Sequence, residues 1–164
     1  MSSFGGTFFT LSPEHKRGLL ASEDDAAVIA YLERLDADAP DRDAVTLDDV
    51  WEPVHRSLTD GYCRTDNGDY PLALAVLGGR QLHDGTGFIV SYVAPGEVRD
   101  LVDALDEIDE AEFADRYSFI DEDDYDEALD DEGLKAAWAA FATLRDFYER
   151  AATQGRATVF VTEQ

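Results

Sequence analysis

The chain has 164 residues, of which 37 are acidic and 13 basic, so its formal net charge is -24. A field of this sign repels nucleic acid and anionic membrane surfaces and attracts basic proteins and cations. We therefore exclude direct binding to nucleic acid or to a membrane from the expected functions, while a hydrophobic content of 45% still allows a folded core.

The first predicted elements are a strand and three helices. An aromatic, β-prone run predicts a strand over residues 4–11, in which two glycines allow a bend or a close approach. Ser12 is typical of a helix N-cap, and Ser22, followed by acids, predicts a second one. Residues 36–43 are expected to be a polar connector, after which Thr46 is predicted to cap a third helix.

The second half of the chain gives the stronger patterns. A short apolar helix is predicted to begin at Pro71, and residues 87–93, apolar nearly throughout, predict a central strand. An amphipathic helix is expected over residues 95–108 and a long one over 134–154, before a last strand at 157–162. This order predicts one α+β domain over the whole chain, with a small, mainly antiparallel or mixed sheet packed against a layer of several helices.

The cysteine content and the N-terminal segment indicate the compartment. Cys63 is the only cysteine, so an intrachain disulfide is excluded. The chain starts without a basic or apolar leader, and no apolar run approaches the ~18 residues that a membrane span requires. We therefore expect a cytoplasmic protein. Cys63 lies in a polar loop beside Arg64, a neighbour that would lower the pKa of its thiol, although a lone loop cysteine is more often incidental.

Several short motifs occur in an order that carries a family resemblance. They are Trp51-x3-His55-x2-Leu58-Thr59, Pro71-Leu72-x2-Ala75-Val76-Leu77-Gly78, Gly87-Phe88 leading to Pro95-x-Glu97-Val98, and Phe147-Tyr148-x2-Ala151-Ala152-x2-Gly155. Over nearly its full length the chain resembles the YfbM-like family of small bacterial domains of unknown function. The resemblance implies an α+β fold and no established activity.

The acids are crowded into one stretch. Sixteen lie between Asp103 and Glu132, where Arg116 is the only basic residue; we call this stretch the acidic segment. Adaptation to salt would spread acids evenly, so the crowding favours a face that binds a basic partner, with aromatic anchors among the acids. The predicted partner-binding residues are Asp115, Tyr117, Asp121, Glu122, Asp123, Asp124, Tyr125, Asp126 and Glu127. Phe119 is instead expected to pack into the core.

Metal and catalytic sites are weakly indicated. An EF-hand begun at Asp121 would place Asp126 where the loop needs glycine for its sharp turn, so we expect no metal and no cofactor. Trp51 and His55 lie one helical turn apart and outline an alternative pocket. His55 would be either a general base or ligand, or a buried histidine that holds the loop after Leu58. The second reading is favoured because no nucleophile or paired carboxylate accompanies it.

These patterns leave three hypotheses. The leading one is a non-enzymatic binding protein, an inhibitor or immunity-type partner of a basic toxin or enzyme that acts on nucleic acid, such as a nuclease or a DNA-modifying ADP-ribosyltransferase. The second is a small-molecule-binding or enzymatic domain with its pocket near Trp51 and His55. The third is a halophilic domain whose acidity is only adaptation. The sequence does not indicate an oligomeric state.

Overall fold

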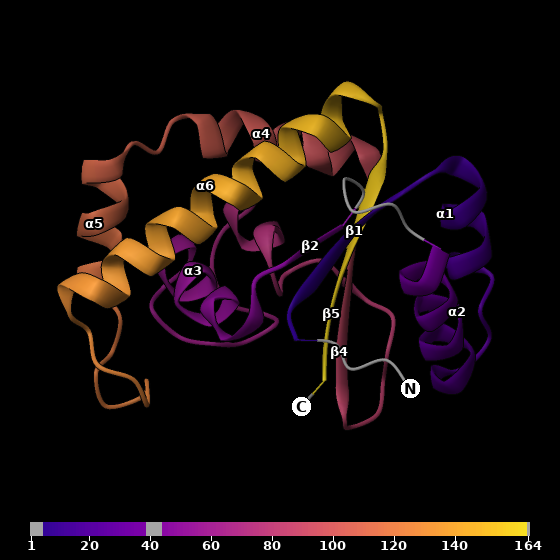
Figure 1. Ribbon diagram of the computed structural model, residues 1–164, viewed down its shortest axis with the longest axis horizontal. Coiled ribbons are helices and arrows are strands. Elements are labelled where there is room, and N and C mark those ends of the chain that lie inside the picture. Colours follow the sequence, from indigo (N-terminus) through magenta and orange to yellow (C-terminus); the bar gives the residue numbers. More distant parts are fainter. Residues whose placement is uncertain (1–4, 39–43, 164) are drawn as a thin grey trace.

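The structure, a computed structural model, describes residues 5–38 and 44–163, and its centre is an antiparallel sheet (Figure 1). The strands run in the spatial order β2-β1-β5-β4-β3. They are β1 (Thr7–Leu11), β2 (Ala44–Thr46), β3 (Arg80–Gln81), β4 (Phe88–Val93) and β5 (Ala157–Glu163). The predicted α+β class is confirmed. The sequence did not indicate the short edge strands β2 and β3, and residue 4 of the predicted first strand lies outside the described residues.

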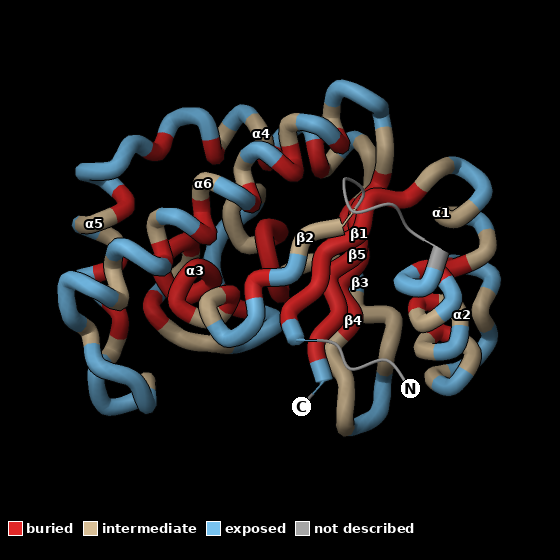
Figure 2. Tube along the Cα trace, in the orientation of Figure 1, coloured by how far each residue is buried: buried red, intermediate tan, exposed pale blue. Residues whose placement is uncertain are grey.

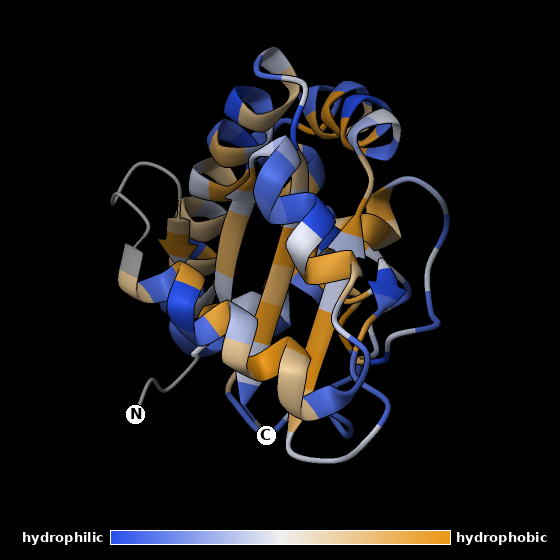
Figure 3. Ribbon diagram, turned by 90° about the vertical axis from the view of Figure 1, so that its right-hand side faces the viewer, coloured by the Kyte–Doolittle hydropathy of each residue, from blue (hydrophilic) through white to orange (hydrophobic). Residues whose placement is uncertain are grey.

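Helices cover both faces of this sheet. The α-helices are α1 (Pro13–Leu20), α2 (Asp25–Asp38), α3 (Trp51–Leu58), α4 (Pro95–Asp106), α5 (Glu110–Ser118) and α6 (Asp131–Thr153), and two 3-10 turns are η2 (Asp48–Val50) and η3 (Leu72–Ala75). The predicted layer contains α3, α4 and α6, whereas α1 and α2 form a further layer on the opposite face (Figures 1 and 3). Within the described residues, no helix has both the length and the apolar character that crossing a bilayer demands.

The central strands are apolar on both sides, which explains the two helical layers. Val159 and Val161 of β5 pack in one buried cluster with Leu32 of α2. Phe160, between them, points the other way and lies 4.7 Å from the ring of Phe8, in the cluster that includes α6. Because neighbouring side chains of a strand point to opposite faces, each face needs its own cover. Figure 2 shows β1 buried throughout and β5 buried up to its last residue, Glu163, which is exposed.

The starts of α1 and α2 show which capping predictions were right. The Ser12 side chain accepts a hydrogen bond from the His15 amide at 3.1 Å, as predicted. The cap predicted at Ser22 is wrong, since its hydroxyl donates back to a carbonyl of α1. Asp24 takes that role instead, accepting from the Ala27 amide at 2.8 Å. A carboxylate one residue before the helix competes successfully with the more distant hydroxyl.

The chain enters α3 through a tight contact with the first strand. Thr46, predicted as a helix cap, ends β2 and lies 3.2 Å from Thr7 through the two hydroxyl oxygens. Gly6 has φ +72, and a Cβ at this position would lie 2.3 Å from Cδ1 of Trp51. The close approach allowed by the glycines in the first strand therefore exists, and it seats Trp51 against Phe160 with ring centroids 5.4 Å apart.

A matched pair of glycine substitutions tests this contact. Gly6→Ala is expected to lower the free energy of unfolding by about 3 kcal/mol, because alanine is strained at positive φ and also displaces Trp51. Gly155 has φ +66 and no atom within 4 Å of an added Cβ, so Gly155→Ala should lose only about 1 kcal/mol. Urea unfolding measures both, and equal losses would show that the Trp51 contact contributes nothing.

Candidate functional site

The acidic segment lies at the end of the molecule remote from α1 and α2 (Figure 1). It comprises the end of α4, the whole of α5, the connection 119–130 and the start of α6; we call that connection the acidic loop. Of the predicted partner-binding residues, Asp115 is exposed on α5, and Glu122 and Asp123 are exposed in the acidic loop.

A buried arginine fastens the acidic loop to α3. Arg56 is 4% exposed, and its Nη1 donates to the Gly61 carbonyl at 3.0 Å and to Oδ2 of Asp124 at 2.8 Å. Its Nη2 donates to the Asp124 carbonyl at 3.1 Å, and its Nε to Oε2 of Glu52 at 3.0 Å. Its guanidinium also lies 5.2 Å from the centre of the Tyr125 ring. One side chain therefore joins α3, the turn after it and the acidic loop.

The charge of Arg56 is secured by its partners. Burial by itself would lower the pKa of the guanidinium, but the hydrogen bonds that it donates to Asp124 and Glu52 outweigh burial and raise that pKa. The sequence contained one signal for this group, the i,i+4 spacing of Glu52 and Arg56. The contact between Arg56 and Asp124 joins positions 68 residues apart, so no local pattern could reveal it.

Two carboxylates of the predicted face form contacts within the molecule that stabilise the acidic loop. Asp121 accepts from the Tyr62 hydroxyl at 3.0 Å and from the Asp123 amide at 2.9 Å. Asp124 pairs with Arg56, as described above. Their charges are thus partly used inside the molecule, and the acids that remain for a partner are their neighbours.

Two of these neighbours, Asp126 and Glu127, line a cleft between α3 and the acidic loop. The cleft has a volume of about 600 Å³, and none of the described residues that line it is basic. Trp51 and Tyr125 lie on its wall, so the structure joins one residue of the predicted pocket to the predicted face. Its carboxylates come from three parts of the chain: Asp49, Glu52, Asp126, Glu127, Asp130 and Glu132. We call this site the acidic cleft.

The sequence did not assign Asp49, Glu52, Asp130 and Glu132 to the site. Asp49 and Glu52 are brought to the acidic loop only by the packing of α3 against the α5–α6 end. Asp130 accepts from the Gly133 amide at 2.8 Å as the N-cap of α6, and Glu132 follows in the first turn of that helix. An N-cap pattern before the long helix was the sequence signal that could have placed Asp130 and Glu132 at the start of α6.

His55 does not share a pocket with Trp51. Its side chain is 1% exposed, and the acidic cleft, which contains Trp51, is not lined by His55. Its Nε2 lies 2.8 Å from Oδ1 of Asn67. The Asn67 amide nitrogen donates to oxygens of Thr59, Asp60 and Tyr62. Because Nδ2 of Asn67 faces these oxygens, its Oδ1 faces His55, and His55 carries its proton on Nε2.

The environment of His55 fits the structural interpretation of this residue. Burial lowers its pKa below the ordinary 6.5, and the hydrogen bond to Asn67 opposes the shift only in part. A neutral imidazole that donates to Asn67 holds the loop after α3, and its burial keeps both ring nitrogens away from a substrate in this conformation.

The aromatic residues of the acidic segment differ from the sequence expectation. Tyr117 was predicted to bind a partner, but it is 5% exposed and belongs to the core, so we remove it from the face. Phe119 was predicted to be buried and is 72% exposed. At the end of α5, Tyr117 and Ile120 take the inward positions, and the two residues between them, Ser118 and Phe119, turn outward. Tyr125 is half-buried, with one side toward the cleft.

The expectation for Cys63 is also corrected. The pKa of its thiol is raised to about 11, mainly by burial and then by the charge of Glu52. The charge of Arg56, and not that of the neighbouring Arg64, opposes this shift. Cys63 is therefore a protonated, half-buried thiol of low reactivity.

Comparison with known proteins places the chain in a family. The domain of unknown function DUF1877 matches residues 1–161. The chain belongs to the DUF1877 family. The crystal structure of YfbM from Escherichia coli, a protein of unknown function, superposes on this DUF1877 domain with a TM-score of 0.73 at 19% identity, covering 95% of this chain and 98% of that one. The resemblance to YfbM-like domains is thus confirmed for the fold. A search of curated proteins found no match.

Arg56→Lys tests whether the guanidinium fork holds the acidic loop. Lysine keeps the charge but cannot span Glu52, the Gly61 carbonyl and Asp124 together. We expect the free energy of unfolding to fall by about 2–3 kcal/mol and hydrogen exchange in residues 119–128 to accelerate. Arg99→Lys, at an exposed position of α4, is the matched control. Unchanged exchange in the loop would contradict the role given to Arg56.

His55→Gln tests the neutral imidazole, since a glutamine amide can still donate to Asn67. The pKa of His55 lies below its unfolded value of 6.5, so below that pH the unfolded chain binds more protons and the native state loses stability. Relative to His55→Gln, the unmodified protein should therefore lose unfolding free energy between about pH 7.5 and about pH 5.5. Urea unfolding at both pH values measures this. A constant difference would contradict the assignment.

Proposed function

We propose that this protein is a non-enzymatic binding protein that holds a basic protein partner in the acidic cleft. The observation that carries the proposal is a set of exposed carboxylates that are not paired with a basic side chain of the described residues. In the described part of the chain, the side chains of Asp49, Asp126, Glu127 and Glu132 accept no hydrogen bond and form no ion pair. Their mutual repulsion is relieved when a partner supplies arginine or lysine.

The aromatic residues give the cleft an apolar part that charge alone would not supply. Trp51 is 8% exposed and is held by Phe160, so its position costs little entropy on binding. Tyr125 is steadied by Arg56. Arginine and lysine side chains stack on such rings through both their alkyl stems and their charge. Rigid aromatics flanked by acids thus suit a basic side chain better than a bare acidic surface does.

The kind of partner follows from the charge of the whole chain. An enzyme that acts on nucleic acid carries a basic cleft, and a protein with net charge -24 would be attracted to it and compete with the substrate. We therefore propose an inhibitor or immunity-type role in the cytoplasm, directed at a nuclease, a DNA-modifying ADP-ribosyltransferase or a toxin of this class. The partner-binding residues proposed are Asp115, Glu122, Asp123, Asp126 and Glu127, together with the cleft residues Asp49 and Glu132.

The test begins with capture of a partner from a lysate of the source organism, washed in steps of rising salt. The purified partner is then titrated with a cleft variant in which Asp49, Asp126, Glu127 and Glu132 become amides. The control variant neutralises Glu14, Glu23, Glu33 and Asp36 on or beside α1 and α2, so its net charge is the same. We expect the cleft variant to bind at least about tenfold more weakly with a flatter salt dependence.

The control variant should retain both the affinity and the inhibition of the partner's action on nucleic acid. If the two variants lose affinity equally, the acidity acts only through net charge and the cleft is not the binding site. If basic proteins are captured indiscriminately and all leave at the first salt step, the proposed function is wrong.

A further inference from the structure

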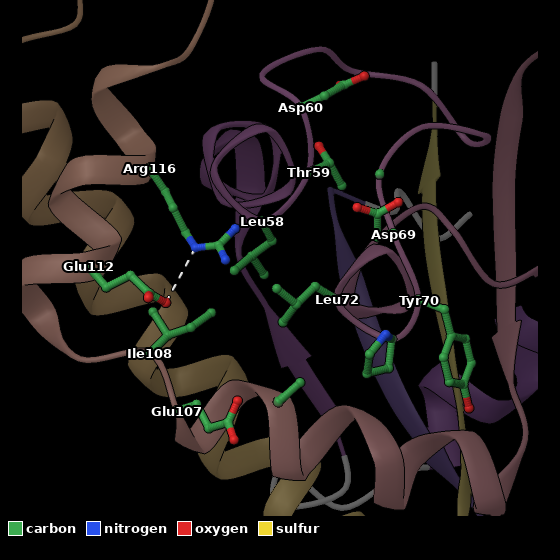
Figure 4. A pocket seen from close by; sticks show the side chains of 13 residues that line it. Leu58, Thr59, Asp60, Asp69, Tyr70, Leu72, Glu107, Ile108, Glu112 and Arg116 are labelled. Atoms are coloured by element: carbon green, nitrogen blue, oxygen red, sulfur yellow. Dashed lines mark hydrogen bonds and ion pairs between the residues drawn. The ribbon is translucent and has the colours of Figure 1, made fainter.

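A second cavity lies at the other end of α3, and it has a different character. It has a volume of about 440 Å³, and it is bounded by the end of α3, the segment before η3, the end of α4 and α5 (Figure 4). Leu58 and Ile108, each 2% exposed, and the half-buried Leu72 give it an apolar floor. It shares no lining residue with the acidic cleft. Its size falls within the range of small-molecule sites.

Arg116 is the single basic residue of the acidic segment, and it lines this cavity. Its side chain is 33% exposed, and its Nε contacts Oε2 of Glu112 at 3.4 Å. Among the described residues, its Nη1 and Nη2 donate no hydrogen bond. Figure 4 shows the guanidinium directed from α5 into the cavity, beside Leu58. Two NH₂ groups at the edge of an apolar floor are suited to a carboxylate, which they can bind in a bidentate manner.

The other charges around the cavity are negative. Asp60, Asp69 and Glu107 lie on its rim, and in the described part of the chain the Asp69 and Glu107 carboxylates form no ion pair or hydrogen bond. With a net charge of -24 on the chain, a ligand with net negative charge, such as a phosphate ester, is repelled. A ligand for Arg116 must therefore bring its own positive group, and the rim carboxylates supply the negative charge that an ammonium needs.

We propose that this cavity binds a small zwitterion with an apolar side chain, namely an α-amino acid. Its carboxylate binds the Nη groups of Arg116, its ammonium faces the carboxylate of Glu107, and its side chain lies on the apolar floor. Each part of the ligand matches one part of the described lining: the two Nη groups of Arg116 that donate no hydrogen bond, the unpaired Glu107 carboxylate, and the leucine and isoleucine surface. This site does not depend on the proposed protein partner, because its lining is separate from the acidic cleft.

Calorimetry on the intact protein tests the proposal with matched probes. L-Leucine, L-isoleucine, L-methionine and L-phenylalanine are titrated beside leucinamide, which lacks the carboxylate, 4-methylpentanoate, which lacks the ammonium, and glycine, which lacks the side chain. We expect at least one of the four amino acids to bind, and all three analogues to bind at least about tenfold more weakly. Leucinamide binding as tightly as leucine would overturn the contact with Arg116, and no binding by any amino acid at millimolar concentration would overturn the site.

Two variants locate the binding. Arg116→Gln should weaken the amino acid at least about tenfold, while Arg99→Gln, the same change at an exposed position outside the cavity, should leave it unchanged. Glu107→Gln should weaken the amino acids without affecting 4-methylpentanoate. Circular dichroism shows whether each variant is folded. If a variant does not fold, the calorimetric titrations of the unmodified protein decide whether the site binds an amino acid. Unchanged affinity in Arg116→Gln would overturn the proposal.

Discussion

The buried guanidinium of Arg56 determines the shape of the acidic end of this molecule. Glu52 and Asp124 are both negative and would otherwise repel each other across the space between α3 and the acidic loop. Arg56 binds both carboxylates and the Gly61 carbonyl as well. These contacts offset the repulsion and fix the distance between α3 and the acidic loop. Arg56 pairs with Glu52 and Asp124 inside the molecule. The other carboxylates of the acidic cleft therefore have no basic side chain beside them in its described lining.

Helix α3 supports both candidate sites. Its first turn carries Trp51, which is seated by Gly6 and Phe160 and forms part of the acidic cleft. Its last residue, Leu58, lies on the floor of the second cavity. Between them His55 and Asn67 tie the following loop to the helix with buried hydrogen bonds. A short helix anchored at both ends thus holds two cavities in fixed positions, although neither cavity is built mainly from its residues.

The two cavities differ in what their charges can recognise. The acidic cleft has carboxylates and aromatic rings with no basic residue in its described lining, so it is complementary to a cation on a larger surface. The second cavity contains one guanidinium among carboxylates above an apolar floor, so it is complementary to a small molecule that carries both charges. In both cases the field of the whole chain excludes net anions, and local pairing decides which groups remain free.

The sequence by itself determined the α+β class, the central strands, the long amphipathic helices and the concentration of acid near α5, because apolar periodicity and composition are local properties. It could not decide which side chains of the acidic segment face outward: Tyr117 and Phe119 are two residues apart, and only the packing at the end of α5 buries the first and exposes the second. Nor could it bring Asp49 and Glu52 to the acidic loop, or separate His55 from Trp51. Those arrangements arise from contacts between distant parts of the chain, such as that of Arg56 with Asp124, and they exist only in the folded state.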